Sequence, residues 1–303
     1  MAGIDINRTT SGVTLPPSVS NEIWQGAQEA SAVMQLATRV DLPGNGAEIQ
    51  VITGDPTANW VNETDEKPVS RGALDTKTMR GYTLAVIEPF SNQFRRDKTA
   101  LYNALVSRLP GVLATKFDNT VFFGTAPGSD FDTLTGAPTA SVENVDGTQT
   151  AYDGFLAALA SVATNDGNLS GWALSPQGEI TALSAKDGNG RPLFTSDLQN
   201  EGSIGSILGR PAYRSTAVYE AGTVGTPGTP ETVGFGGEWA SARWGQVQGV
   251  SISISDQATL NDGGTSLNLW QRNMFAVRAE IEIGFITRDV NRFVRLTGAT
   301  PQA

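Results

Sequence analysis

The stretch DKTALYNALVSRLPGVLATKFDNTVFFG, residues 97–124, carries a hydrophobic pattern with the period of a helix. Its apolar residues recur three or four positions apart and fall on one stripe, formed by Leu101, Leu105, Leu109, Val112, Leu113 and Phe117. This spacing predicts one long helix. Pro110 lies inside it, where proline lacks the N–H of the helical ladder and clashes with the preceding turn, so we expect a bend there.

The residues before this helix predict an arm, a short helix and a long hairpin. Residues 1–20 are polar, and the apolar spacing that follows predicts a helix over about 19–37. Two strand-like runs, Ala47 to Thr53 and Thr76 to Ile87, flank a polar stretch from Gly54 to Asp75. Because two-stranded ribbons are marginally stable in water, we expect this hairpin to lie on another subunit.

The residues after the long helix predict a compact unit followed by returning strands. Residues 150–245 alternate helical and strand-like runs, with one helix over Tyr152 to Ala163 and another opened by Ser175-Pro176. Alternation of apolar and polar residues returns at Val250 to Ile254 and at Met274 to Ile286. The predicted fold class is therefore α+β.

Composition excludes several kinds of chemistry. The 303 residues contain no His and no Cys, which removes imidazole bases, thiolate nucleophiles, disulfides and the usual zinc or copper ligand sets. A formal charge of -10 argues against tight wrapping of nucleic acid, whose affinity depends on clustered Lys and Arg. No run approaches the roughly 20 apolar residues of a membrane span, and no signal peptide is visible. We therefore expect a protein without cofactor, metal or membrane attachment, and no turnover enzyme.

Several short motifs stand in a fixed order along the chain. They are Trp60-Val61-Asn62-Glu63, Asp97 to Gly124, Trp172-Ala173-Leu174-Ser175-Pro176, Lys186 to Leu193, Leu208-Gly209-Arg210-Pro211, Phe235-Gly236-Gly237-Glu238-Trp239, and Asn273 to Glu280. Their order and spacing together resemble the major capsid proteins of tailed bacteriophages. This is the Hong Kong 97-like family, to which encapsulin shells are also related. The resemblance covers most of the chain.

The resemblance implies a Hong Kong 97-like capsid fold with five parts. These are an N-terminal arm and short helix (1–43), an extended E-loop hairpin (44–90), a P domain with a long spine helix (91–148), an A domain (149–245), and returning strands of the A and P domains (246–303). The implied function is structural. Copies of the chain would form the pentamers and hexamers of an icosahedral shell around phage double-stranded DNA.

The same resemblance implies partners and a location. The chain would assemble in the bacterial host cytoplasm and reside in the virion capsid, together with a separate scaffolding protein, a portal and a decoration protein. Three alternatives stay open on the sequence. An encapsulin-type nanocompartment shares the fold, a tail-tube or adhesion protein would also be rich in strands, and a glycoside hydrolase needs only carboxylates. Neither of the last two accounts for a long helix beside a long hairpin.

The hairpin tip is the predicted contact with a neighbouring subunit. Trp60 lies where no intrachain core is expected, and tryptophan is enriched at binding hot spots. We expect acidic residues of the tip to meet basic residues of a neighbour, namely Glu63, Asp65 and Glu66 on one side and Arg95, Arg96 and Lys98 on the other. A solvated run of charges is the alternative interpretation.

A covalent crosslink between subunits is a further implication of the resemblance. In crosslinking members of the family, an E-loop lysine attacks an asparagine carboxamide of a neighbour while a glutamate accepts the proton. Here Asn273 and Glu280 match the asparagine and glutamate, and Lys77 lies close to the lysine's place, with Lys67 as the second choice. Seven strand steps of about 3.3 Å would separate Asn273 from Glu280 by roughly 23 Å, so these two would react together only from different subunits. Ordinary hydrogen bonding within a strand is the alternative role for both.

Overall fold

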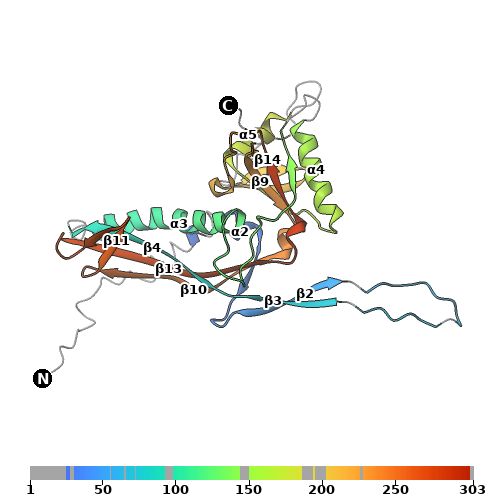
Figure 1. Cartoon of the computed structure of the whole chain (residues 1–303), viewed down its shortest axis with the longest axis horizontal. Coiled ribbons are helices and arrows are strands. Elements are labelled where there is room, and N and C mark those ends of the chain that lie inside the picture. Colours follow the sequence, from blue (N-terminus) through green and yellow to red (C-terminus); the bar gives the residue numbers. More distant parts are fainter. Residues whose placement is uncertain are drawn as a thin grey trace.

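The computed structural model describes residues 25–27, 31–54, 56–64, 66–71, 73–92, 98–143, 150–185, 194, 203–225 and 228–300. The expected arm over 1–20 and the contact residues Asp65, Arg95 and Arg96 lie outside the described residues, as does the side chain of Lys98. The described chain is elongated, with a long helix, two larger sheets and two hairpins (Figure 1).

The helices agree with the sequence pattern in the middle of the chain and differ near its start. They are α2 (Ala32–Leu36), α3 (Lys98–Phe122), α4 (Ala151–Thr164) and α5 (Pro176–Ser184), with short 3-10 turns η2 (Thr216–Val218), η3 (Trp239–Ser241) and η4 (Val290–Arg292). The helix expected over 19–37 is not one continuous helix: residues 25–27 are helical, but the helix is interrupted at Ser31. Ser31 has extended backbone angles and its side chain caps α2, so a new helix begins there and ends before Thr38.

A four-stranded sheet supports α3. Its order is β1 (Thr38–Asp41), β10 (Ala242–Ser255), β13 (Met274–Thr287) and β4 (Tyr82–Ser91), and β13 pairs antiparallel with both β10 and β4. The predicted stripe packs Leu109, Leu113 and Phe117 into the core shared with this sheet, where the Phe117 and Phe285 ring centroids lie 6.5 Å apart. Val112, expected on the stripe, is 49% exposed, because the buried face is narrower than the apolar one.

A six-stranded sheet forms a second unit above one end of the first (Figure 1). Its order is β5 (Thr139–Ser141), β14 (Phe293–Thr297), β9 (Thr232–Gly237), β6 (Gly171–Leu174), β8 (Arg210–Arg214) and β7 (Ser203–Ile207). Phe155 of α4 and Trp172 of β6 meet edge to face at 5.2 Å in its core. The predicted start of α5 is confirmed, since the Ser175 hydroxyl accepts the Gly178 N–H at 3.0 Å.

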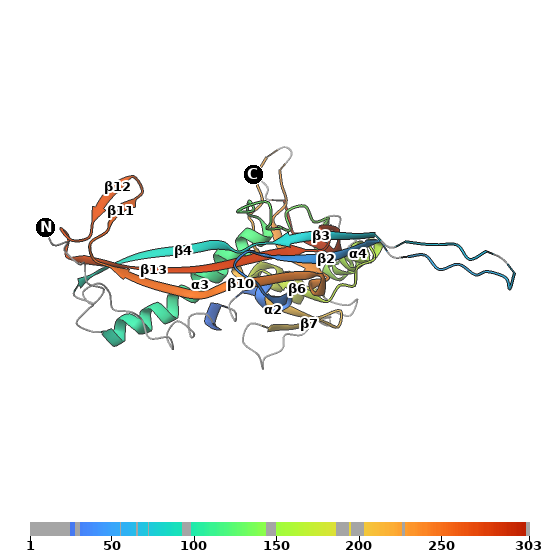
Figure 2. The ribbon, with the colours of Figure 1, turned by 90° about the horizontal axis from the view of Figure 1, so that it is seen from below.

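Two hairpins project from opposite ends of the molecule (Figure 2). The long one pairs β2 (Ala47–Gly54) with β3 (Ala73–Met79), and the short one pairs β11 (Thr259–Asp262) with β12 (Thr265–Asn268). The continuous strand expected over Thr76 to Ile87 is wrong, because the chain leaves β3 and enters β4 across Arg80-Gly81. A Cβ on Gly81 would lie 2.6 Å from the Val247 side chain, so glycine permits this close crossing.

Candidate assembly surfaces

The distal part of the long hairpin, residues 56–71, presents apolar side chains to solvent. Trp60 is fully exposed at 104% and Val69 is 86% exposed. The two sides of the loop are held together by the Thr57 N–H, which donates to the Ser70 hydroxyl at 2.8 Å. Glu63, Glu66 and Lys67 are also exposed. A large aromatic side chain at full exposure has gained no burial on folding, which makes this tip a candidate contact surface.

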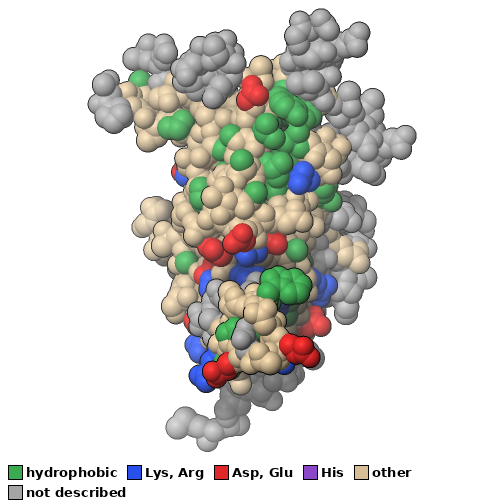
Figure 3. Space-filling model, turned by 90° about the vertical axis from the view of Figure 1, so that its right-hand side faces the viewer, with side chains coloured by type: hydrophobic (Ala, Val, Ile, Leu, Met, Phe, Trp, Pro, Cys, Tyr) green, Lys and Arg blue, Asp and Glu red, His purple; other side chains and the backbone are tan. Residues whose placement is uncertain are grey.

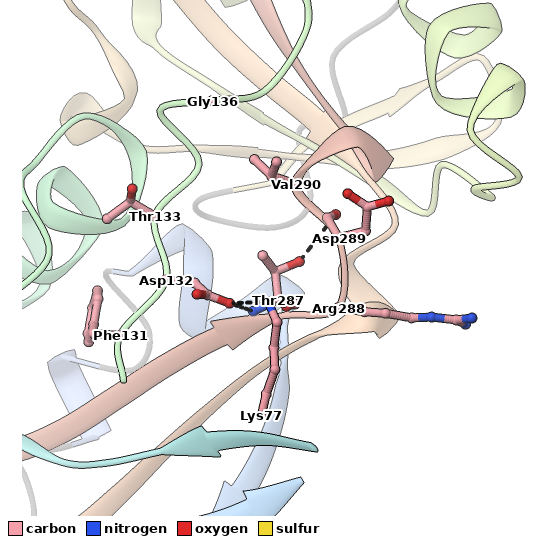
Figure 4. Close-up of a pocket in the computed structure, with 9 residues that line it drawn as sticks. All are labelled: Lys77, Phe131, Asp132, Thr133, Gly136, Thr287, Arg288, Asp289 and Val290. Atoms are coloured by element: carbon pink, nitrogen blue, oxygen red, sulfur yellow. Dashed lines mark hydrogen bonds and ion pairs between the residues drawn. The ribbon is translucent and has the colours of Figure 1, made fainter. Parts of the chain in front are cut away.

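The base of the hairpin is fixed to the body by a small polar network (Figure 4). The Lys77 ammonium donates to Asp132 Oδ2 at 2.9 Å and to the Thr287 carbonyl at 2.8 Å. The same carboxylate oxygen accepts the Thr287 N–H at 2.9 Å. A second ion pair joins Arg80 Nε to Asp130 Oδ2 at 3.2 Å. A cavity of about 440 Å³ opens beside Lys77 and Asp132. Lys77 is therefore a positioning residue for the hairpin within its own chain.

The predicted crosslinking residues are not brought together within one chain. The Asn273 backbone has a positive φ of 55°, and its Oδ1 accepts a hydrogen bond from the Asn92 side-chain amide at 2.8 Å. Glu280 lies in the middle of β13, with Oε1 3.2 Å from Arg278 Nε. Lys77 contacts Thr287 at the other end of the strand. Fourteen steps of about 3.3 Å place Asn273 roughly 46 Å from that end. Any reaction between the Lys77 and Asn273 side chains must therefore join two subunits.

The end of the molecule near Asn273 carries a second exposed aromatic residue that sequence reasoning missed. Trp270 is 71% exposed and follows the β11–β12 hairpin. A signal for this hairpin was present in the sequence. Gly263 and Gly264 both adopt positive φ, and a type I′ turn needs that at its two central positions.

The second unit exposes an apolar face on its helices. Leu156 on α4 is 46% exposed and Ile180 on α5 is 69% exposed. The outward-facing positions of α4 also include Ala157, Ala160 and Ala163. Figure 3 shows hydrophobic side chains gathered on this side of the unit. On α4, apolar side chains therefore occupy exposed as well as buried positions, which makes this face a second candidate contact surface.

The described residues contain no group of three or more side chains suited to hold a metal ion. Over the same ranges of the chain, no helix is long and apolar enough to cross a membrane.

Comparison with known proteins gives these surfaces a context. The model of the phage capsid family matches residues 11–298. The chain belongs to this phage capsid family. It is 33% identical over 297 residues to the probable major capsid protein gp17 of Mycobacterium phage D29, covering 93% of this chain and 89% of that protein. The corresponding protein of Mycobacterium phage L5 is 33% identical over 298 residues, with the same coverage.

Solved structures agree on the fold. A chain from Mycobacterium phage Ogopogo superposes with a TM-score of 0.70 at 17% identity, covering 89% of this chain and 92% of that one. A chain from the capsid of an empty GTA particle, computed with C5 symmetry, gives a TM-score of 0.66 at 12% identity over 90% of both chains. The predicted Hong Kong 97-like α+β fold and the predicted role of a phage capsid protein are confirmed. The relatives support a structural rather than an enzymatic protein.

Proposed function

We propose that this chain is the subunit that builds an icosahedral phage shell from pentamers and hexamers of itself around double-stranded DNA. The observation that carries the proposal is the fully exposed Trp60 at the tip of a hairpin that projects far from the body. Three further apolar positions, Leu156, Ile180 and Trp270, lie on other parts of the surface. Surfaces that differ and do not overlap suit heterologous contacts that close into rings.

The proposed contact places each hairpin tip on a neighbouring subunit. Trp60 and Val69 supply apolar area. The acidic residues of the tip face basic residues of the neighbour. The acidic residues are Glu63, Asp65 and Glu66, and the proposed basic partners are Arg95, Arg96 and Lys98. Exposed ion pairs contribute at most about 1 kcal/mol each, so they select the register of the contact more than they strengthen it. Many such contacts reinforce one another once the shell closes.

The net charge of the chain suits a container for DNA. With 31 acidic against 21 basic residues, the subunit disfavours strong binding of phosphate, and packaged DNA must slide during filling and release. A scaffolding protein, a portal and a decoration protein complete the proposed set of partners, and assembly takes place in the host cytoplasm. An encapsulin shell is the alternative within this fold. Neighbouring genes for a portal and a terminase would support the phage shell, whereas a neighbouring cargo enzyme would support the encapsulin.

A crosslink between subunits is the finer part of the proposal. The lysine nitrogen attacks the Asn273 carboxamide carbon, the new isopeptide C–N bond forms, and the bond to the amide nitrogen breaks. Glu280 accepts the lysine proton and passes it to the departing amide nitrogen, which leaves as ammonia. The exposed Lys67 near the tip suits the nucleophile better than Lys77, whose ammonium is paired with Asp132.

Analytical ultracentrifugation of the chain coexpressed with its scaffold tests the assembly proposal. We expect capsomers and closed shells that sediment far faster than a 31.9 kDa subunit. A monomer under every assembly condition would overturn it.

A further inference from the structure

Asp118, near the end of α3, is a fully buried carboxylate bonded to two distant segments of the chain. Its Oδ1 accepts the Ser31 hydroxyl at 2.5 Å. Its Oδ2 accepts the Ala32 N–H at 2.9 Å and the Ser215 hydroxyl at 3.1 Å. The side chain has no exposed surface. One carboxyl group therefore joins three elements that are far apart in sequence.

Both serines are themselves helix caps. The Ser31 hydroxyl accepts the Met34 N–H at 3.1 Å and so begins α2. The Ser215 hydroxyl accepts the Ala217 N–H at 3.3 Å and so begins η2. Asp118 orients both hydroxyls by accepting their hydrogens. The segment that leads into the fold, the long helix and the second unit thus meet at a single side chain.

The surroundings of Asp118 supply no compensating charge among the described residues. Neither α2 nor η2 carries a titratable side chain. On α3, Lys116 is exposed and lies about 200° around the helix from Asp118. Beside Ser215, the Arg214 guanidinium pairs with Glu179 at 3.4 Å. Burial raises the pKa of Asp118 from 3.8 to about 6, although hydrogen bonds from both serines and from the Ala32 backbone act to lower it.

We propose that Asp118 is a proton-dependent latch, which in its neutral form holds the leading segment against the long helix and the second unit, and which loosens that junction when it ionises. A neutral carboxyl group donates its O–H to one serine hydroxyl, which rotates to accept it, and still accepts from the remaining donors. An ionised one is buried without a counter-charge, which is costly. The latch belongs to the single chain and does not depend on the proposed shell.

The direction of the pH effect follows from the two states. In the closed junction the pKa of Asp118 is about 6, and in the opened junction, where Asp118 is in water, it has the ordinary value of 3.8. Between these values the closed form binds more protons, so its stability falls as pH rises and levels off above about pH 6. For these two pKa values, the equilibrium constant for closing falls about tenfold between pH 5 and pH 7.5.

Hydrogen exchange of the full-length chain, read by mass spectrometry, tests the latch. The measured quantity is the protection factor of the amides of residues 32–36. A protection factor is corrected for the intrinsic pH dependence of exchange, and the amides of α4 serve as the internal reference. We expect wild-type protection to fall about tenfold from pH 5 to pH 7.5, and Asp118→Asn, which keeps the shape without the charge, to show a flat profile.

A second variant keeps the test decisive if Asp118→Asn does not fold. Ser215→Ala removes a hydrogen bond that lowers the Asp118 pKa, so the midpoint of the wild-type transition should move to higher pH. Identical pH profiles of the 32–36 amides in wild type and Asp118→Asn would overturn the proposal. An unchanged midpoint in Ser215→Ala would overturn it independently.

Discussion

Replacing Trp60 with alanine should remove the main anchor of the hairpin tip and leave the subunit folded. In the single chain the side chain is fully exposed, so its loss should change the free energy of unfolding by no more than about 0.5 kcal/mol. In an assembly, burying roughly 200 Å² at about 25 cal/mol/Å² gives an upper bound near 5 kcal/mol. A hot-spot value of about 2–4 kcal/mol per contact is the realistic expectation. That corresponds to at least about a 30-fold weaker contact.

Sedimentation velocity at a series of protein concentrations measures this effect. The protein concentration at which half of the subunits are assembled should rise at least about 30-fold in Trp60→Ala. In Trp60→Phe, which keeps an aromatic anchor, this concentration should lie between the wild-type and Trp60→Ala values. Circular dichroism during urea unfolding supplies the control for folding. Wild-type assembly by Trp60→Ala would refute the reasoning, and so would a loss of several kcal/mol in unfolding free energy, because the second result would place Trp60 in an intrachain core.

Three further predictions concern chemistry and stability. Mature particles boiled in detergent should run as a ladder of oligomers that disappears in Lys67→Arg and in Asn273→Asp but persists in Lys77→Arg; a clean monomer band from wild-type particles would contradict the crosslink. Trp172→Ala should cost about 3–5 kcal/mol in urea unfolding, because its indole is fully buried and donates to a backbone carbonyl, and a cost below about 1 kcal/mol would contradict its place in the core. Asp153→Asn should remove a contribution to stability that is present at neutral pH and lost on acidification, because hydrogen bonds from Thr150 lower the Asp153 pKa. Thermal unfolding of wild type and variant across pH 3 to 7 measures this difference. Parallel curves of unfolding temperature against pH would contradict it.

Local patterns predicted the elements that are regular over many residues. The stripe through Leu109 and Phe117 gave α3, and the alternation after Met274 gave β13, because each pattern depends only on neighbours in sequence. The interruption at Gly81 could not be predicted in this way. It depends on the close approach of Val247, which is far along the chain, and the spacing of neighbouring apolar residues contains no information on such an approach.

The candidate functional residues differ in the same way. Trp60 could be predicted because an aromatic residue inside a long polar stretch has no local core to join. Asp118 could not be predicted, since its hydroxyl partners lie 87 and 97 residues away. Its apolar neighbours on α3, Ala114, Val121 and Phe122, place it on the buried face but do not identify those partners. The pairing of Lys77 with Asp132 is likewise a product of tertiary structure, and it changes which lysine suits a crosslink.

Cryo-electron microscopy of particles from coexpression with the scaffold tests most directly whether the hairpin tip joins neighbouring subunits of a shell. We expect closed icosahedral shells in which the tip of each β2–β3 hairpin lies on a neighbouring subunit with Trp60 buried between them. Particles in which Trp60 remains in solvent, or in which the tip folds back onto its own chain, would contradict it.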